Sequence, residues 1–151
     1  MRPRRIILSL AMVMVLAFIS PLGAQATETN PNPTGEVTIK TTRVAVGLGF
    51  TWGDGTLKFK GKDYKFKVKG LNLIGVGVAS LNAKGDVYNL EKLSDFPGKY
   101  YAVEAGATLI KGSSGLVIKN YHGVIINLKT KEKGVDLRVG NEGLSISPAW
   151  E

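Results

Sequence analysis

Residues 57–69, with the sequence LKFKGKDYKFKVK, alternate apolar side chains with lysines on both sides of a glycine. Successive side chains of a β-strand point to opposite faces, so this segment would have one apolar face and one basic face. A helix would scatter the same lysines around its whole circumference. The segment therefore predicts an amphipathic β-hairpin whose turn contains Gly61.

The same alternation recurs along the chain after Glu36, and we find no stretch of 10 residues there with the apolar period of a helix. Only residues 90–96 have room for a helical turn. Further strands are expected at 36–50, 71–81, 87–90, 100–110, 116–120, 124–128, 135–139 and 144–147. Turns rich in Gly, Asn and Asp are expected at 53–55, 82–85, 95–98, 112–115, 122–123, 131–134 and 140–143.

Short connections favour antiparallel neighbours, because a parallel crossover needs about a dozen residues or more. Glycines inside the predicted strands, such as Gly47, Gly75 and Gly106, allow the sharp coiling found at barrel corners. Closure into a barrel also removes open sheet edges. We therefore expect an all-β domain over 36–148, a small antiparallel up-and-down β-barrel of about 8–10 strands, with a β-sandwich as the alternative.

Residues 1–26 have the order of a secretory signal peptide: a basic start, an uncharged apolar run over 6–20 and a small-residue site at 24–26. The apolar run is shorter than the ~20 residues that cross a bilayer as a helix. We expect cleavage after Ala26, a flexible polar leader over 27–35 and a periplasmic location. A retained N-terminal anchor helix is the alternative.

The chain has no cysteine and a single histidine, His122. This composition excludes disulfides, thiolate catalysis, iron–sulfur clusters, thiolate zinc sites and any site that needs two imidazoles. The glycine-rich run at 47–53 is not followed by a helix whose N-terminus could hold a phosphate. We therefore expect no cofactor, no metal and no enzymatic activity, and an exposed turn position for His122.

Carboxylates remain as catalytic candidates, because a pair of them can hydrolyse a glycan. The aspartates, most of them near predicted turns, are Asp54, Asp63, Asp86, Asp95 and Asp136. Glu104 lies within the predicted strand 100–110, where it alternates with Tyr100 and Ala102. It either points inward as a candidate acid or faces solvent as an ordinary surface glutamate.

Lysines of the predicted hairpin form the strongest charge feature of the chain. They are Lys58, Lys60, Lys62, Lys65, Lys67 and Lys69. They either meet anionic lipid headgroups, lipopolysaccharide or wall polymers, or form a solvated face that protects a sheet edge. Aromatic residues, among them Trp52, Tyr64 and Phe66, would fill the core or line an apolar pocket in a hollow barrel. The candidate ligand contacts are these lysines, Trp52, Tyr64, Phe66 and Glu104.

Short glycine-rich motifs extend over residues 44–147. They are Trp52-Gly-Asp-Gly-Thr-Leu57, Gly70-Leu71, Val87-Tyr-Asn-Leu90, Gly98 followed by Ala105-Gly-Ala-Thr108, and Gly134-Val-Asp-Leu-Arg-Val-Gly140. In these motifs the chain resembles the exported envelope integrity protein A family and is more distantly similar to SYLF lipid-binding domains. The resemblance implies a small soluble periplasmic β-barrel that supports the cell envelope without established catalysis.

These observations favour a non-enzymatic periplasmic protein, a monomer that binds an apolar or lipid-like ligand or makes peripheral contact with envelope lipid, and so supports envelope integrity. An integral outer-membrane β-barrel is an alternative, because alternation does not distinguish inside from outside. The short predicted strands and Pro148 argue against it. A glycan-acting hydrolase is the second alternative. Nucleic acid is not expected as a partner, because export separates the protein from it.

Overall fold

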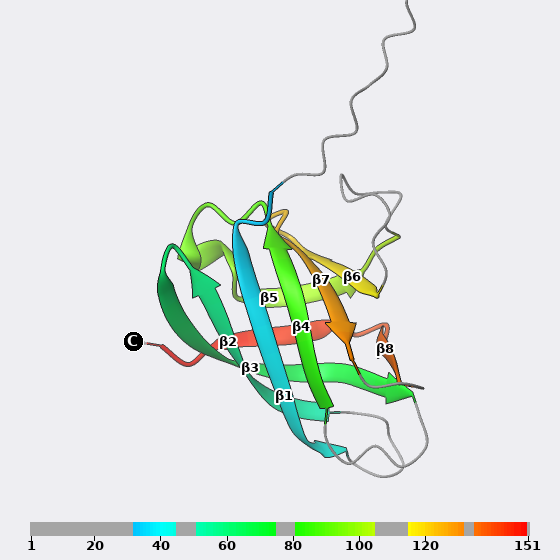
Figure 1. The fold of residues 1–151 in the computed structure, drawn as a ribbon. Helices are drawn as coiled ribbons and strands as arrows, with labels where there is room; N and C mark the ends of the chain where they lie inside the picture. Colours follow the sequence, from blue (N-terminus) through cyan, green and yellow to red (C-terminus); the bar gives the residue numbers. More distant parts are fainter. Residues whose placement is uncertain (1–31, 45–50, 75–80, 105–114, 132–134, 151) are drawn as a thin grey trace, which may run out of the picture.

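The computed structural model describes residues 32–44, 51–74, 81–104, 115–131 and 135–150. The strands in these segments are β1 (Gly35–Val44), β2 (Thr51–Phe59), β3 (Lys62–Ile74), β4 (Leu81–Tyr88), β5 (Gly98–Ala102), β6 (Leu116–Asn120), β7 (Ile125–Thr130), β8 (Asp136–Val139) and β9 (Leu144–Pro148) (Figure 1). A short 3₁₀ turn, η1 (Leu93–Asp95), precedes β5. The described segments contain no helix with the length and apolar character needed to cross a membrane.

The strands form one antiparallel sheet that closes on itself (Figure 1). Hydrogen-bonded neighbours follow the order β2-β1-β4-β7-β6-β5-β9-β3, and a further pairing of β2 with β3 completes a ring of eight strands. The prediction of an all-β antiparallel barrel is confirmed, and the sandwich alternative is not what the chain forms. The ninth strand, β8, pairs with β3 outside this ring order.

The strand order differs from the up-and-down order that the short turns predicted. β4 pairs with β1 rather than with β3, the strand that precedes it in sequence. The reason lies in β3, which has 13 residues and offers its second edge to β8 and β9. With that edge occupied, β4 pairs with the free edge of β1 and continues the ring toward β7.

β8 and β9 lie one after the other along β3. β8 pairs with Leu71–Ile74, and β9 pairs with Phe66–Lys69. The residues between the two strands pass around Gly70, whose φ is 95°. A Cβ atom at Gly70 would lie 2.7 Å from the Gly143 carbonyl oxygen, so glycine is required here both by conformation and by space. The sequence predicted one strand that ends at Lys69 and another that begins at Leu71. In the structure β3 continues through Gly70 as a single strand.

The β2–β3 hairpin has the two faces that the alternation predicted. Lys60 and Gly61 form its turn with φ angles of 49° and 76°, and Phe59 pairs with Lys62 across it. Positive φ at both positions is the signature of a type I′ turn, which matches the twist of the flanking strands. The alternate apolar side chains are buried in the barrel, namely Leu57, Phe59, Phe66 and Val68.

Two glycine-containing segments that were predicted as turns lie inside strands. Residues 53–55 belong to β2, and residues 82–85 belong to β4. The ring of Phe66 lies directly over Gly55 on the paired strand, so that a Cβ atom at Gly55 would be 2.1 Å from Phe66 Cζ. A Cβ atom at Gly85 would lie 2.9 Å from the Leu128 side chain and 3.0 Å from the Val37 side chain. These glycines make room for their neighbours and do not turn the chain.

Inward-facing side chains from all of the described strands form one buried apolar cluster. Phe96, which follows η1, is fully buried in it. Its ring centroid lies 5.1 Å from that of Phe66 and 6.3 Å from that of Tyr100, and such aromatic pairs contribute about 0.5–1.5 kcal/mol each beyond burial. A barrel of this strand number is only wide enough for side chains or one small ligand. The described part of the interior is occupied by side chains.

We expect Gly55→Ala to destabilise the fold by about 1–3 kcal/mol, because the new methyl group would displace the Phe66 ring. Urea unfolding monitored by circular dichroism measures the change. Gly140→Ala is the matched control, since its Cβ atom would meet only Asn72 Nδ2, at 3.5 Å. Equal losses in the two variants would contradict the role given to the Phe66 ring.

Lys60→Asn is expected to stabilise the protein by up to about 1 kcal/mol. Asparagine tolerates the left-handed conformation at the first position of a type I′ turn better than lysine does. The midpoint of thermal unfolding reports the gain. Lys62→Asn removes the same charge at a residue outside the turn, and a gain of equal size there would show that charge, not conformation, is responsible.

Candidate functional site

The outward side of the β2–β3 hairpin carries exposed lysines in cross-strand register. We call the residues Lys58, Lys65, Lys67 and Lys69 the lysine face; all four are exposed. Lys60 and Lys62 are exposed at the turn. Residues 51–74 contain six lysines and two aspartates, and therefore carry a net charge of +4.

Each lysine of this face has a defined neighbour on the opposite strand. Lys67 forms an ion pair with Asp54, and Lys65 donates a hydrogen bond to Thr56 Oγ1 at 2.8 Å. These contacts are exposed, so they add little to stability. Asp54 offsets the charge of Lys67, and the net charge of the hairpin stays positive.

Trp52 pairs with Lys69 at the end of the lysine face. Its side chain is 48% exposed, and it borders a shallow pocket of about 270 Å³ together with Lys69, Ser145 and Ser147. An exposed tryptophan beside lysines combines a large apolar surface with positive charge. This combination suits the boundary between lipid headgroups and acyl chains.

The remaining candidate contacts do not join this surface. Phe66 is buried in the core, and the half-buried Tyr64 packs its ring against Trp150 with centroids 5.7 Å apart. Glu104 follows β5 and is exposed. The inward orientation considered for Glu104 is therefore wrong, and the solvent-facing alternative holds.

The orientation of the hairpin is the reverse of that in a membrane-spanning barrel. Such barrels place apolar side chains toward lipid and polar side chains toward the lumen. Here the apolar members of the alternation are inside, and the lysines are outside. This arrangement argues against the integral outer-membrane alternative.

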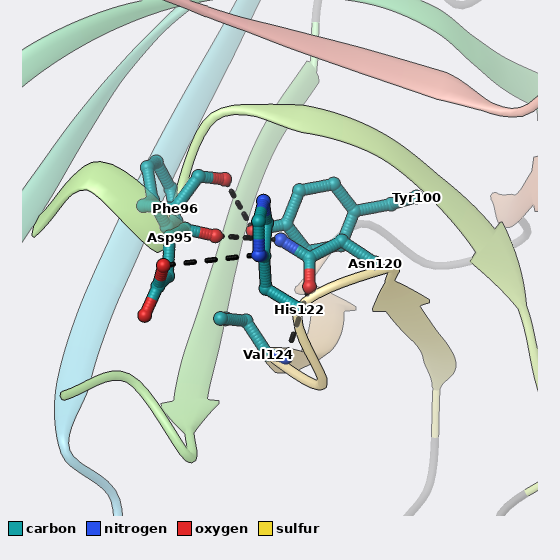
Figure 2. A network of polar contacts seen from close by, with 6 residues as sticks. All are labelled: Asp95, Phe96, Tyr100, Asn120, His122 and Val124. Atoms are coloured by element: carbon teal, nitrogen blue, oxygen red, sulfur yellow. Dashed lines mark hydrogen bonds and ion pairs between the residues drawn. The ribbon is translucent and has the colours of Figure 1, made fainter. Parts of the chain in front are cut away.

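A polar network holds η1 against the turn between β6 and β7 (Figure 2). Asn120 donates from Nδ2 to the Asp95 carbonyl oxygen at 2.7 Å and accepts from the Val124 amide at 2.9 Å. The Tyr100 hydroxyl donates to the Phe96 carbonyl oxygen at 2.5 Å. These contacts satisfy buried polar groups, and they position the buried Phe96 ring.

His122 lies at the edge of this network, where Nδ1 is 3.8 Å from Asp95 Oδ1. Its side chain is 52% exposed, which confirms the prediction of an exposed turn histidine. Within the described segments no group of three His, Asp or Glu side chains is placed to hold a metal ion.

Sequence reasoning missed a second polar surface, a groove of about 600 Å³ over β1, β4 and β7. Its charged residues are scattered along the chain, from Glu36 to Lys131. Only the strand order β1-β4-β7 brings them together. The alternation within each strand shows which side chains point outward. It does not show which strands are neighbours, so it could not predict that these side chains share a groove.

The fold defines a small closed antiparallel β-barrel. A solved structure of a beta-barrel-like, uncharacterized protein from Brucella abortus is similar to it, with a TM-score of 0.56 and 28% sequence identity over 79% of this chain and 76% of that chain. No protein-family model matches the sequence, and no curated protein matches it.

Burial raises the pKa of the Tyr100 hydroxyl above its ordinary value of 10, and a hydrogen bond with the Asn120 side chain opposes this in part. The folded state therefore keeps the Tyr100 proton to higher pH than the unfolded state does. The stability that the protonated Tyr100 hydroxyl contributes is fully present below pH 10 and is lost as the pH rises above 10.

We expect Tyr100→Phe to cost about 1–3 kcal/mol at pH 8, because the Phe96 carbonyl loses its donor. Between pH 8 and pH 11, wild type should lose more stability than Tyr100→Phe, as urea unfolding at the two pH values measures. Tyr121→Phe is the control, since Tyr121 is 99% exposed. Identical pH dependence of wild type and Tyr100→Phe would contradict this reading.

Proposed function

We propose that this protein is an exported, non-catalytic β-barrel that makes peripheral contact with anionic lipid of the cell envelope through the lysine face and Trp52. The observation that carries the proposal is an exposed tryptophan in register with a row of exposed lysines on the outside of the barrel. Lysines near an anionic membrane contribute about 1 kcal/mol each to binding.

Two further observations support a role at the envelope. The order of residues 1–26 is that of a secretory signal, which would deliver the domain to the periplasm. The glycine-rich motifs resemble those of the exported envelope integrity protein A family, and the barrel is similar to the Brucella abortus structure. A role in envelope integrity follows as part of the proposal.

The packed interior leads us to place the lipid contact on the outer surface. Phe66, Phe96 and Tyr100 occupy the described part of the barrel with their side chains fully or almost fully buried. An apolar ligand inside would have to displace these rings. Contact through Trp52 and the lysine face requires no rearrangement of the core.

The proposal predicts binding to vesicles that contain phosphatidylglycerol and much weaker binding to vesicles of phosphatidylcholine alone. Lys65→Gln combined with Lys69→Gln should weaken the binding at least tenfold, because two charges are lost from the contact. Added salt should weaken wild-type binding as it screens the charges. Co-sedimentation of the protein from residue 27 onward with vesicles measures all three effects.

Lys92→Gln combined with Lys119→Gln is the matched control, since both lysines are exposed and lie outside the hairpin. Trp150→Phe leaves Trp52 as the single tryptophan of the chain, so a blue shift of its fluorescence on vesicle addition reports its entry into the headgroup region. Equal loss in the control pair, or no shift from Trp52, would refute contact through this face.

A further inference from the structure

The groove over β1, β4 and β7 contains two parallel rows of side chains of opposite character. The register places Glu36 opposite Asp86 and Asp86 opposite Asn127, so that hydrogen-bond acceptors from three adjacent strands form one row. Lys84 lies opposite Lys129 and forms the second row. Lys84 and Asp86 are two residues apart on β4, which puts the rows side by side on the same face.

Each row brings like charges together. Carboxylates face each other at Glu36 and Asp86, and ammonium groups face each other at Lys84 and Lys129, an arrangement that destabilises a sheet. In the part of the chain that the structure describes, none of these four side chains enters an ion pair within 4.0 Å. The two rows therefore present negative and positive charge side by side to whatever occupies the groove, with Lys58 of β2 opposite Glu36 at the outer end of the acceptor row.

Asn127 adds an independent observation at the end of the acceptor row. The residue is 3% exposed, and it lines the groove. Its Oδ1 atom has no hydrogen-bond partner among the described residues. A buried amide oxygen without a donor is costly, and in native structures such an atom is commonly paired with a bound water, ion or ligand; Asn72 Oδ1 is a second such atom.

We propose that this groove binds a small zwitterion in which an ammonium group is joined to a phosphate by a short chain, the chemistry of phosphoethanolamine. The ammonium donates to Glu36, Asp86 and Asn127 Oδ1. The phosphate accepts from Lys84, Lys129 and Lys131, which also lines the groove.

The charges of the groove match this ligand. Three lysines and two carboxylates give the groove a net charge of +1. A phosphate monoester carries close to two negative charges at neutral pH, so with its ammonium the ligand carries about −1. Inorganic phosphate would leave the acceptor row unused, and an amine alone would leave the lysine row unused. The inference does not rest on membrane contact through the lysine face, although Lys58 of that face lies opposite Glu36.

Isothermal titration of free O-phosphoethanolamine into the protein from residue 27 onward tests the site. We expect binding at least tenfold tighter than that of inorganic phosphate or ethanolamine. Phosphocholine should also bind at least tenfold more weakly, because its quaternary ammonium has no N–H group for Asn127 or the carboxylates. A short-chain phosphatidylethanolamine below its critical micelle concentration distinguishes a lipid source from the free compound: tighter binding of the lipid identifies a membrane headgroup, and tighter binding of the free compound identifies a soluble ligand.

Asp86→Asn and Lys84→Met should each reduce the affinity for phosphoethanolamine at least tenfold, while Lys119→Met, an exposed lysine outside the groove, leaves it unchanged. Asn127→Leu should abolish binding and raise the melting temperature, since it removes the unpartnered acceptor. Should Asn127→Leu fail to fold, the two exposed variants still decide the matter. Phosphoethanolamine that binds no tighter than phosphate, or that binds Asp86→Asn and Lys84→Met as tightly as wild type, would overturn the proposal.

Discussion

The pairing of β2 with β3 turns an open sheet into a barrel, and the interior and the charged surface both depend on its register. The register places the Phe66 ring over Gly55, where it reaches Phe96 in the core. It also turns the lysine face to the outside. A slip of one residue would exchange the two faces, burying lysines and exposing aromatic rings. The type I′ turn at Lys60 and Gly61 fixes this register locally.

The strands followed from local signals, whereas several turns and the strand order did not. Alternation in 57–69 predicted the hairpin and its two faces, because the order of apolar residues and lysines within this segment is enough to show which face is buried. Residues 53–55 and 82–85 were mistaken for turns because a glycine that makes room for a distant ring looks, in sequence, like a glycine that bends the chain. The order of the strands depended on the length of β3, which continues through Gly70.

The two candidate surfaces also differ in whether the sequence alone could predict them. The lysine face comes from one hairpin, so its residues were found from spacing alone. The groove combines Glu36, Asp86 and Asn127 from three strands that are far apart in sequence. No pattern within one strand reveals that the buried Asn127 will lie opposite Asp86. Such a site becomes visible only when the neighbours in the sheet are known.

The position of β9 in the ring has a consequence for how the chain matures. β9 bonds to β3 on one edge and to β5 on the other, and it is the last of the described strands to be synthesised. The ring of described strands therefore cannot close until β9 has left the ribosome. Until β9 is in place, the edges of β3 and β5 that it covers stay unpaired, and open strand edges of this kind invite pairing between chains.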